Sequence, residues 1–149
     1  MTVGDTASQQ LGKAWRRTGF WMSVPLALFQ GLSAVSAFRN PDAFAAKFGA
    51  PLADAGDAAW VHVYGLRTAF IALLGTGLLL RRDLNGLKWA LVVAPVMPLG
   101  DAYVASQAGA PLQVCVQHMV VALYVMLAAA TLWFGTRGQQ PRIASSSLS

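Results

Sequence analysis

The chain has 149 residues, of which 56% are hydrophobic and only 11% are charged, and its formal net charge is +5. Because soluble domains usually carry roughly 25% charged residues, this chain has too little polar surface for a soluble fold, and we expect an integral membrane protein. The basic residues lie near the ends and in one short loop, which indicates orientation in a lipid bilayer and argues against nucleic acid as a partner.

The N-terminal part predicts a polar segment followed by a membrane span. Residues 1–17 are polar and end in basic residues, so we expect a cytoplasmic segment. The uncharged apolar run at 18–38 has about the ~20 residues that cross a bilayer as a helix. A signal peptide is the competing interpretation, because the small residues at 33–37 resemble a cleavage site. The length of the apolar run favours a span.

A short helix is expected in the loop that follows the first span. Asn40 suits the N-cap, Pro41 suits the first turn, and Gly49 suits the end of the helix. Phe44 and Phe48, four residues apart, would share one face. We expect this face to lie on the outer membrane surface or to cover the bundle as a lid. An ordinary capped connector is the open alternative.

Three further apolar runs follow, at 60–80, 87–106 and 114–134. They predict helices, since a lone apolar segment in lipid can satisfy its backbone amides only within itself. Asp57 could cap the second span. Pro95 and Pro98 remove backbone hydrogen bonds from the third, so we expect a kink there. Residues 135–149 are polar and predict a disordered cytoplasmic tail.

The placement of basic residues predicts which ends of the spans face the cytoplasm. With four spans, eight basic residues fall on one side and two, Arg39 and Lys47, fall on the other. The eight are Lys13, Arg16, Arg17, Arg81, Arg82, Lys88, Arg137 and Arg142. Since cytoplasmic loops are enriched in Lys and Arg, both termini should be cytoplasmic. We therefore predict an all-α protein, a four-transmembrane-helix bundle at 18–134, in the plasma or inner membrane.

Small residues predict where the helices approach one another. Ser23, Ala27 and Gly31 recur at every fourth position of the first span, and Gly65 and Ala69 do so in the second. Such spacing favours close helix packing in membranes. It does not separate packing within one chain from a homo-oligomer, so both remain open.

Three ionisable residues lie inside the spans, where each needs a polar partner: Arg67, Asp101 and His118. Counted from the outer ends of their spans, they lie about five to seven residues inward, which at about 1.5 Å per residue is roughly 7 to 11 Å below the outer boundary. We therefore expect all three at one depth, facing the bundle interior. Further polar or aromatic residues lie near this depth and are candidate substrate-binding residues: Gln30, His62, Tyr64, Tyr103 and Gln117.

This polar cluster admits two main interpretations, and a third in which Arg67 snorkels toward the membrane surface. In the structural one, Arg67 and Asp101 form a buried ion pair, and His118 and the glutamines complete hydrogen bonds that set helix order in an accessory or structural subunit. In the functional one, Asp101 and His118 exchange protons with a lipophilic small molecule and Arg67 holds an anionic group. The second interpretation predicts a cofactor-independent acid/base isomerase or cyclase.

Metal and cofactor sites are not expected. The potential ligands are His62, His118, Asp101 and Cys115, without the spacing of a familiar zinc site, and His62 lies nearer the membrane surface than a haem ligand pair with His118 would need. A single cysteine also excludes an internal disulfide.

Several short motifs resemble a known family. Residues about 19–134 are similar to small four-helix membrane proteins described as domain of unknown function 4267. The motifs that carry the resemblance are Tyr64-Gly65-Leu66-Arg67-Thr68, Arg81-Arg82-Asp83, Pro98-Leu99-Gly100-Asp101 and His118. The resemblance implies a four-span bundle related in outline to DoxX-like membrane proteins, without an established activity. The family pattern has Arg-Asp in the second span, whereas this chain has Arg67-Thr68.

Overall fold

The computed structural model describes residues 3–136, and these residues form helices joined by turns and short loops. The elements are α1 (Val3–Arg39), α2 (Pro41–Phe48), a 3-10 turn (Ala55–Asp57), α3 (Ala58–Leu80), α4 (Leu84–Val93), α5 (Val96–Gln107) and α6 (Leu112–Thr136). The predicted tail at 135–149 lies outside the described residues, except that Gly135 and Thr136 form the end of α6.

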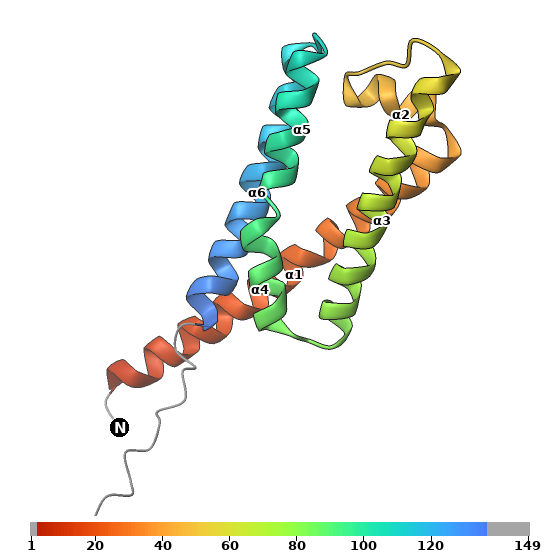
Figure 1. The fold of residues 1–149 in the computed structure, drawn as a ribbon. Helices are drawn as coiled ribbons and strands as arrows, with labels where there is room; N and C mark the ends of the chain where they lie inside the picture. The colour runs from red at the N-terminus through yellow and green to blue at the C-terminus, as the bar shows by residue number, and fades with distance from the viewer. Residues whose placement is uncertain (1–2, 137–149) are drawn as a thin grey trace, which may run out of the picture.

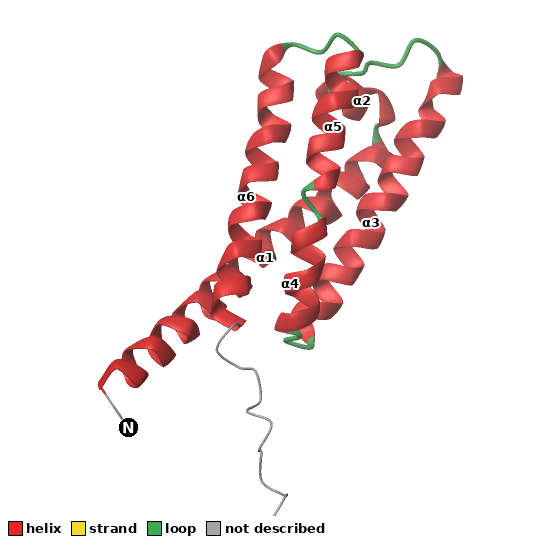
Figure 2. Ribbon diagram, turned by 60° about the vertical axis from the view of Figure 1, so that its left-hand side comes forward, coloured by secondary structure: helices red, strands yellow, loops and turns green. Residues whose placement is uncertain are grey.

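Four helical segments are long and apolar enough to cross a membrane: Gln9–Arg39, Ala58–Leu80, Leu84–Gln107 and Leu112–Thr136. This confirms the all-α fold class and the predicted number of helices that could span a membrane. Helix α1 runs obliquely through the bundle (Figure 1) and packs mainly against α3 and α6. The short helix α2 lies at the end of the bundle opposite to the N-terminal end of α1 (Figure 2).

Small residues allow α1 to lie close to α3, as the spacing of Ala27 and Gly31 predicts. A methyl group added at Gly31 would lie 3.8 Å from Cβ of Ala72, and one added at Gly75 would lie 3.6 Å from Cβ of Ala27. No large side chain lies between the two helices here. The backbone of each helix therefore lies close to an alanine methyl group of the other. Both helices belong to one chain, so this packing requires no second copy.

Helix α1 also crosses α6 at very short range. A methyl group added at Gly19 would lie 2.6 Å from the side chain of Leu132, and one added at Gly135 would lie 2.8 Å from the backbone nitrogen of Arg16. Tyr124 on α6 donates a hydrogen bond of 3.1 Å to the carbonyl of Met22 on α1. Glycines at the crossing therefore determine how closely α1 and α6 pack.

The predicted short helix α2 is confirmed with its capping residues. Oδ1 of Asn40 accepts a hydrogen bond of 3.0 Å from the backbone nitrogen of Ala43, and Pro41 begins the helix. Gly49 ends it with a φ of 94°, a left-handed conformation that favours glycine. The side chain of Phe48 is buried, so one face of α2 packs onto the bundle.

Two boundaries differ from the expected elements. Helix α1 begins at Val3, so the polar N-terminal segment continues into the first span without a break. The third span consists of two helices, α4 and α5, interrupted at Ala94 and Pro95. The interruption lies at the predicted kink, since Pro95 has no amide hydrogen with which to continue the helix.

The prediction that Asp57 caps the second span is wrong, because its side chain makes no capping hydrogen bond. Asp57 occupies the N-cap position of α3 but makes no side-chain hydrogen bond to that helix. Its Oδ2 accepts hydrogen bonds from the backbone nitrogens of Ala53, at 3.0 Å, and Asp54, at 3.4 Å. The carboxylate stabilises the preceding turn because that turn folds back onto it.

Replacing Gly135 by Ala is expected to destabilise the fold. The added methyl group meets the backbone of Arg16, so α1 and α6 must separate, at the cost of about 1 to 3 kcal/mol that overpacked cores show. Thermal unfolding in detergent, followed by circular dichroism, measures the effect. Gly77→Ala is the matched control, because no described atom outside the adjoining backbone of its own helix lies within 4 Å of the added methyl group, and Ala favours a helix by up to about 1 kcal/mol. Equal melting temperatures for both variants would contradict the close crossing.

Candidate functional site

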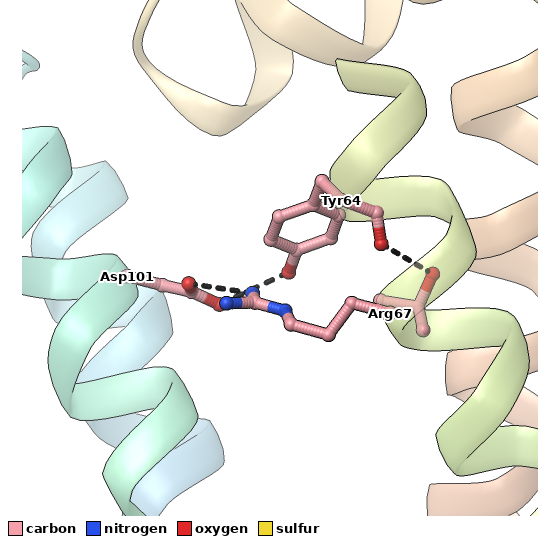
Figure 3. Close-up of polar contacts among 4 residues, drawn as sticks. Tyr64, Arg67 and Asp101 are labelled. Carbon is pink, nitrogen blue, oxygen red and sulfur yellow. Dashed lines mark hydrogen bonds and ion pairs between the residues drawn. The ribbon is translucent and has the colours of Figure 1, made fainter. Parts of the chain in front are cut away.

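Asp101 on α5 is held by two side chains of α3. Nη2 of Arg67 donates a hydrogen bond of 2.9 Å to Oδ1 of Asp101, and the Tyr64 hydroxyl donates one of 3.0 Å to Oδ2. The guanidinium carbon of Arg67 also lies 4.3 Å from the centre of the Tyr64 ring. Figure 3 shows both side chains reaching from α3 toward Asp101. The expected ion pair is therefore present, and both carboxylate oxygens accept hydrogen bonds.

The helix geometry explains why Tyr64 and Arg67 act together. Residues three apart lie on one face of a helix, so both side chains point from α3 toward α5. The two helices make few direct contacts, because α3 packs mainly on α1 and α5 on α6. The side chain of Arg67 is 41% exposed and that of Asp101 only 12%. These polar groups thus form a bridge across the space between α3 and α5, with Arg67 on its outer side.

A cavity of about 140 Å³, here called the core cavity, lies between α1, α3, α4, α5 and α6. The polar residues in its wall are Ser23, Gln30, Tyr64, Asp101 and His118. The rest of the wall is largely apolar and extends to Leu87 and Leu91, which belong to the main hydrophobic cluster between α4 and α6. The interrupted part of the third span contributes Ala94 and Pro98 to the wall. The core cavity therefore has one polar part and one apolar part.

His118 on α6 carries the free polar atom of this site. Among the side chains that the structure describes, its Nε2 is buried and has no hydrogen-bond partner. The centre of the Phe48 ring on α2 lies 5.1 Å from the centre of the imidazole ring. It also lies 5.4 Å from the centre of the Tyr64 ring. A buried nitrogen without a partner is energetically unfavourable unless a ligand or water completes it. His118 is thus available to bind or to exchange a proton.

A second and larger cavity, here called the α2 cavity, lies between α1, α2 and α6 and measures about 800 Å³. It shares four wall residues with the core cavity: Phe29, Tyr64, His118 and Val121. Lys47, Gln113 and Gln117 add polar groups to it. The two cavities therefore meet beside His118, underneath the aromatic face of α2.

The structure places the predicted site residues in three groups. Gln30, Tyr64, Asp101 and His118 line the core cavity, and Gln117 lines the α2 cavity. Arg67 lines neither cavity and contacts Asp101 from outside. His62 and Tyr103 are not brought into the site. The ring of His62 stacks on that of Phe38, with 5.6 Å between the ring centres. Tyr103 is 65% exposed.

Sequence reasoning missed two features of the site. It did not place Phe48 against His118, although the shared face of Phe44 and Phe48 was a signal for a covered surface. It also did not place Lys47 in the wall of a cavity. No group of three His, Cys, Asp or Glu side chains that could hold a metal ion occurs within residues 3–136.

Comparison with known proteins identifies the family of this chain. Residues 26–134 match the model of the family described as Domain of unknown function (DUF4267). The comparisons with curated proteins and with solved structures found no match, so the likeness to DoxX-like proteins stays a prediction. The matched region contains Arg67, Asp101 and His118 and the helices that position them. Because it covers most of the sequence, the chain belongs to the DUF4267 family.

Proposed function

We propose that this protein binds a lipophilic small molecule inside the membrane and acts on it as a cofactor-independent acid/base isomerase or cyclase. The observation that carries the proposal is the buried, unpartnered Nε2 of His118 in the wall of two adjoining cavities. Histidine is the side chain best suited to take up and return protons near neutral pH. A largely apolar cavity with a few polar groups is also the usual form of a small-molecule site.

The contacts support a division of roles within the site. His118 removes a proton from one atom of the bound molecule and, as the imidazolium, returns a proton at another atom, so the reaction needs no oxidant or reductant. Tyr64 donates its hydroxyl proton to Asp101, which leaves its oxygen, in the cavity wall, to accept a hydrogen bond from the bound molecule. Asp101, with both oxygens occupied, positions Tyr64. Arg67 balances the charge of Asp101, which lowers the cost of burying the carboxylate in hydrocarbon.

A structural role is the second candidate, and the bridge itself favours it. Tyr64 and Arg67 link α3 to α5, two helices that otherwise make few contacts. Buried polar groups can specify which helices pack together without adding much stability. In this case the protein would be an accessory subunit, and its polar groups would determine assembly.

We propose further that both termini are cytoplasmic and that α2 lies at the outer membrane surface. Six of the basic residues that predict this orientation lie in the described part of the chain, near the start of α1 and around the turn between α3 and α4. Nζ of Lys88 lies 5.4 Å from the ring centres of both Trp89 and Trp133. Lysine and tryptophan side chains at one level are typical of a membrane interface.

Cysteine labelling in intact cells tests the orientation. In a Cys115→Ala background, Ala53→Cys in the loop after α2 should react with a membrane-impermeant maleimide in intact cells. Asn85→Cys at the start of α4 should react only after lysis, because the basic turn is expected in the cytoplasm. The reverse labelling pattern would invert the proposed topology.

His118→Gln should abolish proton exchange with the bound molecule. Wild-type protein in nanodiscs, incubated in D₂O with a lipid extract of its host, is expected to incorporate deuterium into one lipophilic compound, as removing and returning a carbon-bound proton requires. High-resolution mass spectrometry detects the label. His62→Gln is the matched control, since His62 lines neither cavity, and it should retain the exchange. Labelling by His118→Gln at the wild-type rate would reject the acid/base role.

Asp101→Asn and His118→Gln are expected to differ in stability. Asp101→Asn leaves Arg67 without its anionic partner, and breaking a buried ion pair costs about 3 to 5 kcal/mol. We expect a smaller loss, about 1 to 3 kcal/mol, because Arg67 is partly exposed. His118→Gln removes no hydrogen bond of the described residues and should shift the melting temperature little. Equal destabilisation by the two variants would favour the structural role for both residues.

A further inference from the structure

The two cavities together have the form of a site for an elongated molecule. Both are lined by Tyr64 and His118, so the two cavities adjoin at these side chains, and a ligand that reaches past them occupies both. The core cavity leads from these residues between the helices to Leu87 and Leu91. The α2 cavity leads from them to the polar residues on α2 and at the start of α6. Each end of such a ligand would therefore meet a different chemical environment.

The core cavity determines the size and polarity of one end of the ligand. Its deep part is largely apolar, since the hydroxyl of Ser23 there is hydrogen-bonded to the carbonyl of Gly19. Its volume of about 140 Å³ is close to that of an engineered apolar cavity, about 150 Å³, that binds benzene. A slender hydrocarbon tail or a single ring fits this space. The two acyl chains of a phospholipid do not, because together they occupy several times this volume.

The α2 cavity determines the charge of the other end of the ligand. Its wall contains Lys47, Gln113 and Gln117, and none of the described residues that line it is acidic. In the described part of the chain, Lys47 forms no ion pair, whereas the only ion pair there joins Arg67 to Asp101. The anion-holding role that the sequence suggested for Arg67 therefore fits Lys47 better, because the charge of Arg67 is already balanced.

We infer that the ligand is a single-tailed anionic amphiphile, whose carboxylate binds Lys47 in the α2 cavity and whose apolar tail enters the core cavity past His118. This inference rests on the proposed function and names the substrate class of the same site. His118, which lines both cavities, then meets the ligand where the head group joins the tail. Phe48 covers this position on the side of α2.

Binding of radiolabelled decanoate and decanol tests the inference. The full chain is placed in phosphatidylcholine nanodiscs, and binding to empty nanodiscs is subtracted. We expect saturable binding of decanoate that is at least about tenfold tighter than that of decanol, the factor expected for one charge-assisted hydrogen bond. Lys47→Gln should remove this preference and leave decanol binding unchanged. Arg39→Gln is the matched control, since Arg39 is an exposed basic residue outside both cavities.

Ala90→Phe tests where the tail lies. Ala90 lines the core cavity, so a phenyl ring there should fill the cavity and weaken binding of decanoate and decanol alike. Where this variant fails to fold, the Lys47→Gln comparison still decides the inference, because Lys47 is exposed.

The outcomes separate this inference from the proposed function. Equal affinities for decanoate and decanol, unchanged in Lys47→Gln, would overturn the anionic head group. Complete displacement of decanoate by dipalmitoyl phosphatidylglycerol would overturn the restriction to one tail. Binding no greater than to empty nanodiscs would overturn the ligand class. None of these results would remove deuterium exchange that depends on His118, which tests the proposed function by itself.

Discussion

A carboxylate inside the hydrocarbon layer must find hydrogen-bond or ionic partners within the protein. At Asp101 this requirement determines how α5 is joined to α3. Tyr64 and Arg67 satisfy it from α3, although α3 and α5 are not in close contact. Because two long side chains supply the link, the helices stay apart while remaining joined. The space between them contributes to the core cavity, whose polar part contains Asp101 and Tyr64. The bridge thus holds α3 and α5 together and also forms part of the wall of the core cavity.

His118 lines the same cavity as this bridge and differs from it in chemistry. Asp101 has both oxygens occupied, whereas Nε2 of His118 has no partner among the residues described. Polar groups that only determine helix order are expected to satisfy one another, and His118 does not fit this expectation. The contrast separates a residue that holds the structure from one that is available to a ligand. It is the reason to consider chemistry, and not assembly alone, for this family.

The small residues of α1 and the short helix α2 make this arrangement possible. Glycines let α1 cross α6 and run along α3 at short range, so α1 connects the two sides of the bundle (Figure 1). At the far end of α1, α2 folds back and places Phe48 over His118 and Tyr64. Covering the site with an aromatic side chain keeps it apolar, while Lys47 on the same helix supplies a positive charge near its edge.

Local signals in the sequence determined the four apolar helices and the caps of α2, because length, hydropathy and capping residues act over a few neighbours. The pairing of Arg67 with Asp101 was predicted from their opposite charges inside the spans. Local signals also indicated the depth of each polar residue, since depth follows from position along a span. Depth does not determine the direction in which a side chain points around its helix. Helix packing decided that direction: it turned His118 into the cavities, His62 and Tyr103 away from them, and Arg67 to the outer side of its ion pair.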